Sequence, residues 1–406
     1  MVDNMAGILK TQILIFSAIV AAVMLVTVVL LPAVTDDQQD DSKLPEFTVS
    51  GETDLDGNIF ISFVYSSNII MLDGKGNIVW SKHEDPPSDG VKAGFWDFKK
   101  HIIGGETYYS YHDQDSKYDK LGIDGYAPGE RVILDSDFKE VKRISFEQSD
   151  TVEKGHPLDG HDFLLIDLDH YIMSGYIKTQ VTNIPDHGPS NVVFSYLQEV
   201  DHGNVVWDWR SIDYPELYGL TVTDANPYAN DFDNVHVEAP DYVHFNAMRL
   251  NDNGELVCSF RHLNTIMGLD RTSETNQILW KLSGNGDEFG LTAEQRTSSQ
   301  HYVTVDGNTV TAFDNHNPAQ ATRIVTYTID IANRQLLDFK EYRIDGKYSS
   351  ACGSAQRLYG DTFALGWGCS QNDAVCFCIY DFAQDKELIS VTLANPENFT
   401  YRCVYY

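Results

Sequence analysis

The sequence predicts an all-β fold, a six-bladed β-propeller preceded by a single N-terminal transmembrane helix. Two repeated patterns predict the propeller. In the first, a histidine opens a strand, a turn follows, and a second strand ends in polar residues; its copies lie at residues 161–176, 244–261 and 301–316. A polar residue that recurs at one position of successive units points its copies toward one centre, as in a radially repeating fold.

The second pattern alternates with the first and has the form of a β-hairpin closed by tryptophan. Each copy reads as a strand, a turn with Asp or Gly, and a short apolar strand; the copies lie at residues 68–80, 197–207 and 266–280. The two patterns together supply four strands, the content of one blade. Fainter units begin near Thr48, Phe95 and Ser350, so about six units fill the chain.

Helical periodicity is nearly absent after residue 45. We therefore expect residues 47–406 to form one closed propeller, with the final strand near Tyr401–Tyr406 beside a strand from another part of the chain. A chain of 406 residues has the length of two or three ordinary domains, but a propeller occupies this length as one unit.

The N-terminal segment predicts a membrane anchor. Residues 11–34 carry no charged side chain and are mostly apolar, and this stretch exceeds the roughly 20 residues that a helix needs to cross a bilayer. Lys10 precedes the stretch and aspartates follow it, which favours a cytoplasmic segment at residues 1–10. No clear cleavage motif follows, so an uncleaved signal anchor is favoured over a cleaved signal peptide. Residues 35–46, rich in Asp and Gln, predict a flexible acidic tether.

The expected protein is thus a single-pass protein of the cell membrane with its propeller outside the cytoplasm. Its 60 acidic and 29 basic residues give a formal charge of −31. This charge argues against binding to nucleic acid and against docking of the propeller on anionic lipid. It suits either an extracytoplasmic surface or a salt-adapted organism, and composition leaves both open.

All six cysteines follow the predicted membrane span. Five of them lie near the C-terminus: Cys352, Cys369, Cys376, Cys378 and Cys403. In an oxidising compartment, one or two disulfides are expected to clip the last blade. Cys258 stands alone in a strand and is expected to be a buried thiol. No second Cys or His pair accompanies the C-terminal pair at 376 and 378, so a zinc knuckle is not predicted.

The candidate site combines residues from three units. His244 and Asn246 are two residues apart, so their side chains share one face of the predicted strand, and Arg261 lies on the neighbouring strand. Imidazole, amide and guanidinium groups on one face form a site for an oxyanion. His161 and His301 hold the equivalent positions in adjacent units. We therefore expect all five side chains to reach one cavity at the end of the central channel.

Ordinary structural roles compete with this interpretation. A single histidine on a strand is more often a structural residue, and only the repetition in three units shifts the balance toward function. Asp159, His161 and the later His316 can also be turn residues that bond their own backbone. Four histidines lie in predicted loops and are expected to be solvated: His156, His187, His202 and His236.

Several of these motifs resemble one known family. Residues 241–248, 253–254 and 259–266 are similar to the central signature of the bacterial arylsulfate sulfotransferases. The likeness continues to Gln300-His301 and to residues 313–315, and Gly160-His161-Asp162-Phe163 resembles an earlier histidine motif of the family. The resemblance covers roughly residues 150–320.

The resemblance implies a six-bladed propeller that moves a sulfuryl group from a phenolic sulfate ester to a phenol acceptor, with no nucleotide donor, cofactor or metal. In the family a histidine is transiently sulfated, which gives a ping-pong reaction. By motif position, His301 is the nucleophile. His161, His244, Asn246 and Arg261 would hold the sulfuryl oxygens and handle the phenol proton. Dividing the transfer into two steps lets donor and acceptor use one pocket in turn.

One departure from the family keeps other functions open. The family usually has aspartate directly after the nucleophilic histidine, and this chain has Tyr302. A membrane-tethered binding propeller without catalysis is therefore one alternative. A metal enzyme with histidine ligands on the axis is another, although Arg261 disfavours a metal ion beside it. Aromatic residues of loops 182–190 and 214–240 either stack on a phenol or pack within the loops. The sequence does not indicate the oligomeric state.

Overall fold

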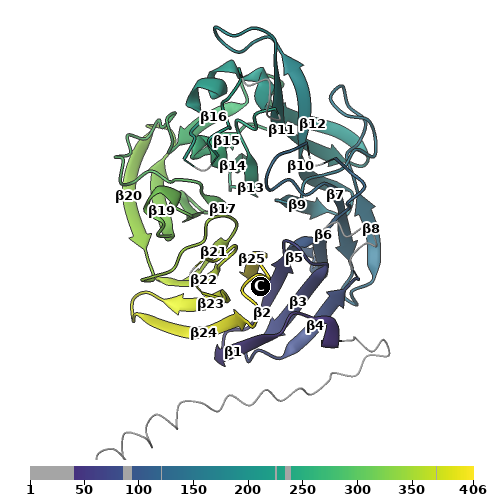
Figure 1. Cartoon of the computed structure of the whole chain (residues 1–406), viewed down its shortest axis with the longest axis vertical. Coiled ribbons are helices and arrows are strands. Elements are labelled where there is room, and N and C mark those ends of the chain that lie inside the picture. The colour runs from purple at the N-terminus through teal and green to yellow at the C-terminus, as the bar shows by residue number, and fades with distance from the viewer. Residues whose placement is uncertain (1–40, 86–93, 120, 225, 234–238, 372) are drawn as a thin grey trace, which may run out of the picture.

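The computed structural model describes residues 41–85, 94–119, 121–224, 226–233, 239–371 and 373–406. In these residues the strands form six antiparallel sheets around a central axis (Figure 1). The all-β fold and the six-bladed propeller are confirmed. The transmembrane helix expected at residues 11–34 lies outside the described residues. Within them, no helix has the length and apolar character that a membrane crossing requires.

Each blade is built on four strands, which are ordered from the axis of the ring to its rim. The inner strands of blades 1 to 6 are β25 (Thr400–Tyr405), β5 (Phe95–Ile103), β9 (Phe163–Asp167), β13 (Phe245–Leu250), β17 (His301–Asp306) and β21 (Ser354–Tyr359). The second strands are β2 (Asn58–Phe63), β6 (Glu106–Gln114), β10 (His170–Val181), β14 (Leu256–Phe260), β18 (Thr309–Asp314) and β22 (Thr362–Gly366).

The two outer strands of each blade correspond to the pattern that ends in tryptophan in three of the units. The third strands are β3 (Asn68–Asp73), β7 (Gly129–Leu134), β11 (Ser190–Asp201), β15 (Thr265–Leu269), β19 (Arg323–Asp330) and β23 (Val375–Asp381). The fourth strands are β4 (Ile78–His83), β8 (Glu140–Ile144), β12 (Asn204–Arg210), β16 (Ile278–Leu282), β20 (Gln335–Tyr342) and β24 (Lys386–Leu393).

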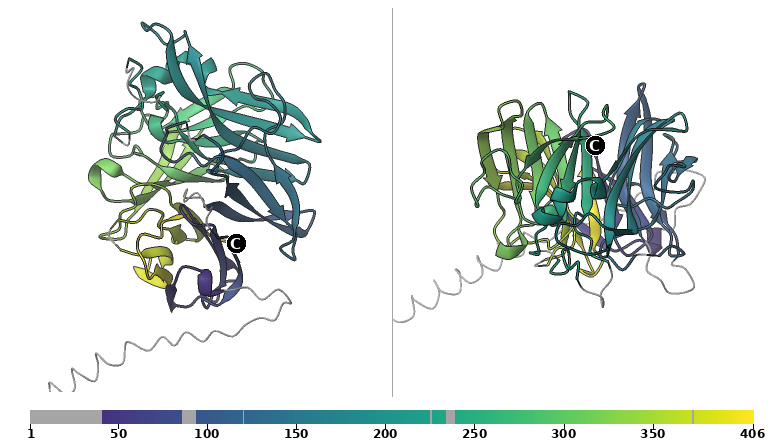
Figure 2. Two further views of the ribbon diagram at one scale, coloured as in Figure 1. Left: turned by 45° about the vertical axis from the view of Figure 1, so that its right-hand side comes forward. Right: turned by 90° about the horizontal axis from the view of Figure 1, so that it is seen from above.

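The two ends of the described chain close the ring together. The C-terminal strand β25 pairs with β2, with Ile59 opposite Tyr405, and so becomes the inner strand of blade 1. Strand β1 (Phe47–Gly51) pairs with β24, with Phe47 opposite Leu393, and adds a fifth strand to the rim of blade 6. The expected pairing of the final strand is confirmed. Figure 2 shows the closed ring from two further sides.

Burial explains why the strand sequences change from the axis to the rim. The second strand β14 is buried at every position, because both faces of its sheet are covered by neighbouring blades, and its sequence is accordingly apolar. The rim strand β20 has mostly exposed side chains, and its sequence mixes Asp, Lys and Glu with Leu and Phe. The cores therefore lie between blades.

The start of the described chain docks on blade 1. The short 3-10 helix η1 (Asp41–Lys43) belongs to the segment expected to be a tether. Asp41 accepts a hydrogen bond from Ser81 at 3.0 Å, and Lys43 pairs with Asp85 at 2.9 Å. Residues 35–40 lie outside the described part. Four further 3-10 helices are η2 (Ser211–Asp213), η3 (Pro215–Leu220), η4 (Arg261–Leu263) and η5 (Asn317–Ala319).

A buried network of charges connects the inner strands near the axis. Arg402 of β25 contacts Asp97 of β5 at 2.9 Å, and Arg249 of β13 contacts Asp162, just before β9, at 2.9 Å. Lys99 joins the two carboxylates, at 2.9 Å from Asp97 and in contact with Asp162. Removing one partner of such a network would leave an uncompensated buried charge, so it fixes the blades in one arrangement around the axis.

Candidate functional site

The predicted site residues lie at the face of the ring where the inner strands begin. His161 lies just before β9, His244 directly precedes β13, and His301 opens β17. Each second strand is antiparallel to its inner strand and so ends at the same face. Arg261 directly follows β14, and Asn315 directly follows β18. Antiparallel topology therefore brings residues from distant parts of the chain to one end of the axis.

Two of the three histidines form a pair, and a buried carboxylate supports each ring. The rings of His161 and His244 are perpendicular, with centroids 5.0 Å apart. Nδ1 of His161 lies 2.6 Å from Oδ2 of Asp159, and Nδ1 of His244 lies 2.5 Å from Oδ2 of Asp241. A carboxylate only accepts hydrogen bonds, so Nδ1 of each ring carries a proton, and Nε2 is the nitrogen left for proton transfer.

An amide, rather than a carboxylate, supports His301. Its Nδ1 lies 2.6 Å from Oδ1 of Asn315 and 3.1 Å from the carbonyl oxygen of Ser299. The Nδ2 of Asn315 donates to the carbonyl oxygens of Ser349 and Cys352, so its Oδ1 is the acceptor. Nδ1 of His301 is therefore protonated, and Nε2 accepts a hydrogen bond from the backbone N–H of Cys352 at 3.2 Å.

Burial and neighbouring charges keep His244 and His301 neutral. Burial, followed by the charge of Arg261, lowers the pKa of His301 well below its usual value. Burial, followed by His161 and Arg261, lowers the pKa of His244 in the same way. At neutral pH both rings therefore present an unprotonated Nε2, which is the form that can act as a nucleophile or as a base.

Arg261 supplies the positive charge of the site. Its backbone N–H donates to the carbonyl oxygen of His244 at 2.8 Å, and its Nη1 lies 3.1 Å from Nε2 of His262. Burial lowers the pKa of Arg261, but a guanidinium starts from so high a pKa that it stays charged. The site therefore combines one fixed cation with the neutral imidazoles of His244 and His301.

The local backbone differs from the expected alternation along two strands. His244 has a left-handed φ of 51° and stands outside β13, and the pairing with β14 shifts register between Phe245 and Ala247. Arg261 is not on the strand, because β14 ends at Phe260 and Arg261 opens η4. The expectation that Arg261 lies on the neighbouring strand is wrong. Irregular backbone, rather than alternation along a strand, aims these side chains.

Asn246 is fully buried and supports the chain next to His301. The side-chain Nδ2 of Asn246 donates to the backbone carbonyl oxygen of Gln300 at 2.7 Å. The backbone carbonyl oxygen of Asn246 accepts a hydrogen bond from Nη2 of Arg402 at 2.6 Å. Asn246 therefore links the charge network near the axis to the residue that precedes His301. A contact between Asn246 and a sulfuryl oxygen stays a prediction.

Tyr302, which takes the place of the family aspartate, turns away from the imidazole of His301. Its ring is buried beside the guanidinium carbons of Arg249 and Arg402, at 4.7 and 4.9 Å from the ring centroid. Tyr302 thus packs on the charge network by cation–π contacts. In this chain Asn315 orients His301, and the change to tyrosine leaves that contact intact.

Aromatic side chains complete the wall of the site. Trp96 of blade 2 and Tyr401 of blade 1 stack with centroids 4.7 Å apart, and each lies within 6 Å of the ring of His161. Tyr176 of β10 stacks on His244 at 5.4 Å with an interplanar angle of 29°. The sequence analysis missed these residues, although Trp96 and Tyr401 lie near the start of the inner strands of blades 2 and 1, as the histidines do in blades 3 to 5.

The segment between β6 and β7 passes directly over the histidines. A Cβ built on Gly125 would lie 3.3 Å from Cε1 and 3.5 Å from Nε2 of His244, and 3.7 Å from Cε1 of His161. Gly125 also has a φ of +85°, which favours glycine. Only a residue without a side chain leaves space in front of both rings. The sequence analysis gave no signal for this contact, because it depends on the path of a loop.

Sequence reasoning also missed the partners of the histidines. Asp159 and Asp241 support His161 and His244, and the Asp-x-His and Asp-x-x-His spacings are a signal for both. The ring of His262 lies 4.6 Å from that of His244, and its Nδ1 donates to the carbonyl oxygen of Asp241 at 2.6 Å. Its place in the motif, directly after Arg261, is the only signal for His262.

The described histidines that the sequence places in turns and loops lie outside this cluster of partners. The backbone N–H of His316 donates to Oδ1 of Asp314, so this residue belongs to a turn as expected. His202 is exposed and pairs with Asp201, and His187 contacts Asp233. His156 is half-buried rather than fully solvated. His236 lies outside the described residues.

Asp241, His244 and His262 offer donor atoms within 4.8 Å of one another. These donors already have partners, because Nδ1 of His244 bonds Asp241 and Nδ1 of His262 bonds the carbonyl oxygen of Asp241. The guanidinium of Arg261 lies 3.1 Å from the remaining ring nitrogen of His262. A fixed cation beside the donors disfavours a metal ion, so the arrangement supports imidazole chemistry better than metal binding.

The six cysteines are thiols in this structure. Cys258 is fully buried, as expected. The Sγ atoms of Cys352 and Cys369 lie 3.4 Å apart, next to the backbone N–H that bonds His301. The disulfides expected in the last blade stay a prediction, and this pair lies close enough to be a candidate in an oxidising compartment.

In the described part of loop 214–240, three aromatic side chains pack on other aromatic rings. Tyr214 stacks on Trp209 at 5.8 Å, and Tyr218 packs on Tyr242 at 4.5 Å. Phe232 packs on Tyr218 in turn. These aromatic side chains pack among themselves, which is the alternative that the sequence left open for loop 214–240.

The neutral buried histidines predict a loss of stability in acid. Burial lowers the pKa of His262 to about 3, whereas in the unfolded chain its pKa is about 6.5. Between about pH 6.5 and pH 3, His262 of the unfolded chain binds a proton that His262 of the folded chain does not. The stability that neutral His262 contributes is therefore complete above about pH 6.5 and is lost as the pH falls below it. The free energy of unfolding should then fall by about 1.4 kcal/mol per pH unit for each such histidine.

Chemical denaturation at pH 7.5, 6.0 and 5.0 measures this slope. The slope should be shallower in His262→Gln, because the variant lacks one histidine that must stay neutral. Parallel slopes for the variant and the unaltered protein would show that His262 is free to bind a proton in the fold.

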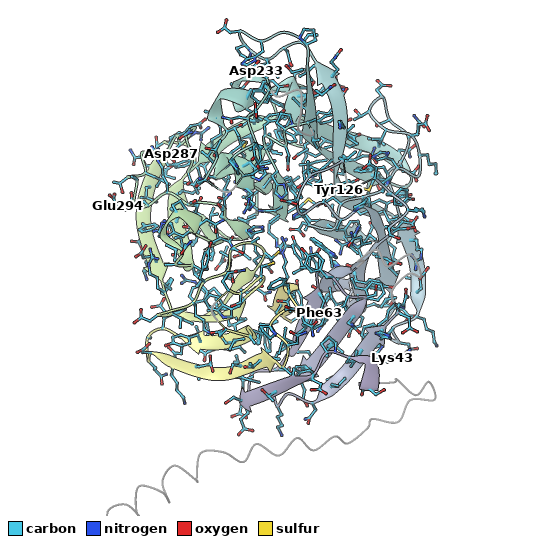
Figure 3. All side chains as sticks on the ribbon, in the orientation of Figure 1. Lys43, Phe63, Tyr126, Asp233, Asp287 and Glu294 are labelled. Carbon is cyan, nitrogen blue, oxygen red and sulfur yellow. The ribbon has the colours of Figure 1, made fainter. Side chains whose placement is uncertain are left out.

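The geometry defines the chain as a β-propeller protein with a histidine-lined site at one end of its axis. Figure 3 labels Tyr126, which directly follows Gly125 in the segment between β6 and β7. The sequence model of the family described as Arylsulfotransferase (ASST) matches residues 116–369, more than half of the chain. The chain belongs to the arylsulfotransferase family. No curated protein matches the sequence.

Solved structures of other proteins are similar at low identity. A protein of unknown function from Bacteroides caccae has 11% identity and a TM-score of 0.44, with 86% of this chain and 98% of that chain covered. A catalytically inactive virginiamycin B lyase from Staphylococcus aureus has 12% identity and a TM-score of 0.35, covering 86% and 100%. A periplasmic gluconolactonase from Pseudomonas aeruginosa has 13% identity and a TM-score of 0.36, covering 88% and 99%.

Proposed function

We propose that this protein transfers a sulfuryl group from a phenolic sulfate ester to a phenol acceptor by a ping-pong mechanism through a sulfated His301. Membership of the arylsulfotransferase family supports the reaction class. One observation supports the choice of nucleophile. Of the three histidines at the axis, His301 alone has an amide as its Nδ1 side-chain partner, whereas His161 and His244 have carboxylates.

The different Nδ1 partners suggest different catalytic roles for His301 and for the other two histidines. A carboxylate stabilises an imidazolium, so a ring that it supports takes up a proton more readily. An amide offers no charge, and beside Arg261 the ring of His301 stays neutral with its Nε2 lone pair available. His301 therefore suits nucleophilic attack, and the carboxylate-supported rings suit proton transfer.

In the first half-reaction, the lone pair of Nε2 of His301 attacks the sulfur of the aryl sulfate. The N–S bond forms, the S–O bond to the phenol breaks, and the phenolate oxygen takes its electron pair and a proton from His161. We assign the proton to His161 because two protonated rings would repel each other at 5.0 Å and burial keeps His244 neutral. In the second half-reaction the acceptor phenol returns its proton to His161, and its oxygen takes the sulfuryl group from His301.

Two groups are placed to stabilise the sulfuryl oxygens during transfer. The guanidinium of Arg261 is the fixed cation of the site. The backbone N–H of Cys352 donates a hydrogen bond to Nε2 of His301 at 3.2 Å. Once Nε2 is bonded to sulfur, this N–H can donate to a sulfuryl oxygen instead. Donors fixed before the reaction stabilise developing charge without reorganising.

From the membrane anchor predicted at residues 11–34, we further propose that this reaction takes place outside the cytoplasm. Protease added to intact cells should then degrade the propeller. Full protection of the propeller until the cells are lysed would contradict this location.

Turnover of para-nitrophenyl sulfate with added phenol tests the function. Release of nitrophenol should depend on the acceptor, and initial rates at several acceptor concentrations should give parallel double-reciprocal lines, as a ping-pong reaction requires. Intersecting lines would contradict the covalent mechanism. Binding of the aryl sulfate without turnover would favour the non-catalytic binding propeller, the second candidate, for which the departure at Tyr302 is the only support.

A further inference from the structure

The guanidinium of Arg261 has a neutral side chain as its partner. Its Nη1 lies 3.1 Å from Nε2 of His262. Within the described ranges of the chain, no carboxylate forms a salt bridge with this guanidinium, whereas the buried Arg402 pairs with Asp97 at 2.9 Å. An imidazole can hold a guanidinium in place without neutralising its charge, so the charge of Arg261 stays available for an anion.

The hydrogen bonds of His262 determine which of its ring nitrogens is the acceptor. Nδ1 lies 2.6 Å from the backbone carbonyl oxygen of Asp241, which only accepts, so Nδ1 carries the proton. Burial lowers the pKa of His262 to about 3, so the ring is neutral at pH 7. Nε2 therefore keeps its lone pair, and it accepts a hydrogen bond from Nη1 of Arg261, which only donates.

The backbone of His262 is fixed on both sides. Its N–H donates to the carbonyl oxygen of Val243 at 3.1 Å, and its carbonyl oxygen accepts from the N–H of Val222 at 2.8 Å. The ring is buried, and it lies 4.6 Å from the ring of His244. His262 thus offers its lone pair from a fixed position beside the histidine cluster. A guanidinium that is already held by one nitrogen loses less rotamer freedom when it binds an anion.

We propose that His262 is a positioning residue, which orients the guanidinium of Arg261 toward the sulfuryl oxygens and leaves its charge uncompensated for them. The inference rests on the proposed function, and it adds a residue that acts on the sulfuryl group only through Arg261. A guanidinium has its N–H donors in a planar fork, so one bond to His262 restricts the fork and leaves the other donors for an anion.

Binding of benzenesulfonate to the full chain tests the inference without turnover. This anion carries sulfonyl oxygens like those of an aryl sulfate, but its C–S bond does not take part in the transfer. Ligand-observed NMR measures the affinity, because it also detects weak binding. His170→Asn is the control for a lost histidine. His170 opens β10 and bonds Glu199 at 2.7 Å, and this variant should bind benzenesulfonate as the unaltered protein does.

Two amide variants of His262 separate the positioning role from a structural role. The Nδ2 of His262→Asn takes the place of Nδ1 and keeps the bond to the carbonyl of Asp241, but no atom reaches Arg261. The longer side chain of His262→Gln places an oxygen near the former Nε2, where it accepts from Arg261. We expect about tenfold weaker benzenesulfonate binding in His262→Asn, and most of the affinity should return in His262→Gln. A structural role through Asp241 alone predicts the reverse order of the two variants, which would overturn the assignment.

A double-mutant cycle tests whether His262 acts through Arg261. In an Arg261→Ala background, His262→Asn has no guanidinium to release, so it should weaken benzenesulfonate binding no further. Equal losses from His262→Asn in both backgrounds would overturn the assignment, and so would an unaltered protein that does not bind the anion. Coupled losses at both residues, in a protein that transfers no sulfuryl group, would support the role of His262 and refute only the proposed reaction.

Discussion

His301→Ala should lose sulfuryl transfer from aryl sulfates almost completely, with a fall in kcat of roughly four orders of magnitude or more, as for other removed nucleophiles. The variant keeps Arg261 and the two carboxylate-supported histidines, so it should still bind the ester. Initial rates with para-nitrophenyl sulfate and phenol measure the loss. Added imidazole should restore part of the activity, because a small free base can occupy the space of the deleted ring.

His202→Ala is the matched control for this variant. His202 is an exposed histidine that pairs with Asp201 at the rim end of blade 3, and its removal should leave the rate unchanged. A His301→Ala protein that keeps full turnover would assign the nucleophile to another ring, and His161 and His244 would be the candidates.

Arg261→Ala should slow the transfer by two to three orders of magnitude, the usual cost of removing one donor from a developing oxyanion. The guanidinium is the fixed cation nearest the imidazoles, and its charge is one reason for the low pKa of both His301 and His244. The loss should appear mainly in kcat, since charge redistributes over the sulfuryl oxygens in the transition state. Arg261→Lys should recover part of it, because lysine keeps the charge but not the planar fork.

Arg343→Ala provides the control for a lost arginine. Arg343 is on the surface, where it pairs with Glu341, and its removal should change the rate little. Equal effects of Arg261→Ala and Arg343→Ala would mean that Arg261 acts only through the overall charge of the protein.

The fold was predictable because its two patterns repeat. A histidine at or just before the start of three inner strands, and a tryptophan in three of the outer hairpins, identify four strands per unit. The topology then follows, including the closing strand β25. The repeated histidines also predict the face of the ring where the site lies, because residues at equivalent positions of a propeller share one end of the axis.

The details of the site were not predictable from alternation along strands. His244 lies outside its strand in a left-handed conformation, and Arg261 belongs to a 3-10 turn. The positions of Gly125 and Tyr176 depend on how a loop of blade 2 meets blade 3, which no local pattern encodes. The orienting carboxylates Asp159 and Asp241 had a spacing signal, but the same spacing occurs in ordinary turns.

Tyr302 shows how a departure from a family motif can mislead. An acid directly after His301 suggests a partner for the imidazole, and its absence suggested a weakened site. In the structure residue 302 points into the charge network near the axis, where its ring contacts Arg249 and Arg402. Asn315, which lies 14 positions after His301, holds the ring of His301 by a hydrogen bond to Nδ1. The position of a side chain in the fold, rather than its place in the motif, decides what it contacts.

Incubation of the full chain with a radiolabelled aryl sulfate and no acceptor tests the central proposal most directly. The account predicts a burst of one phenol per protein and one acid-labile sulfuryl group, which peptide mapping finds on His301 and which added phenol removes. A label on His161 or His244 would contradict the assignment from the Nδ1 partners. Steady turnover that starts without a burst and leaves no label on the protein would contradict the covalent mechanism itself.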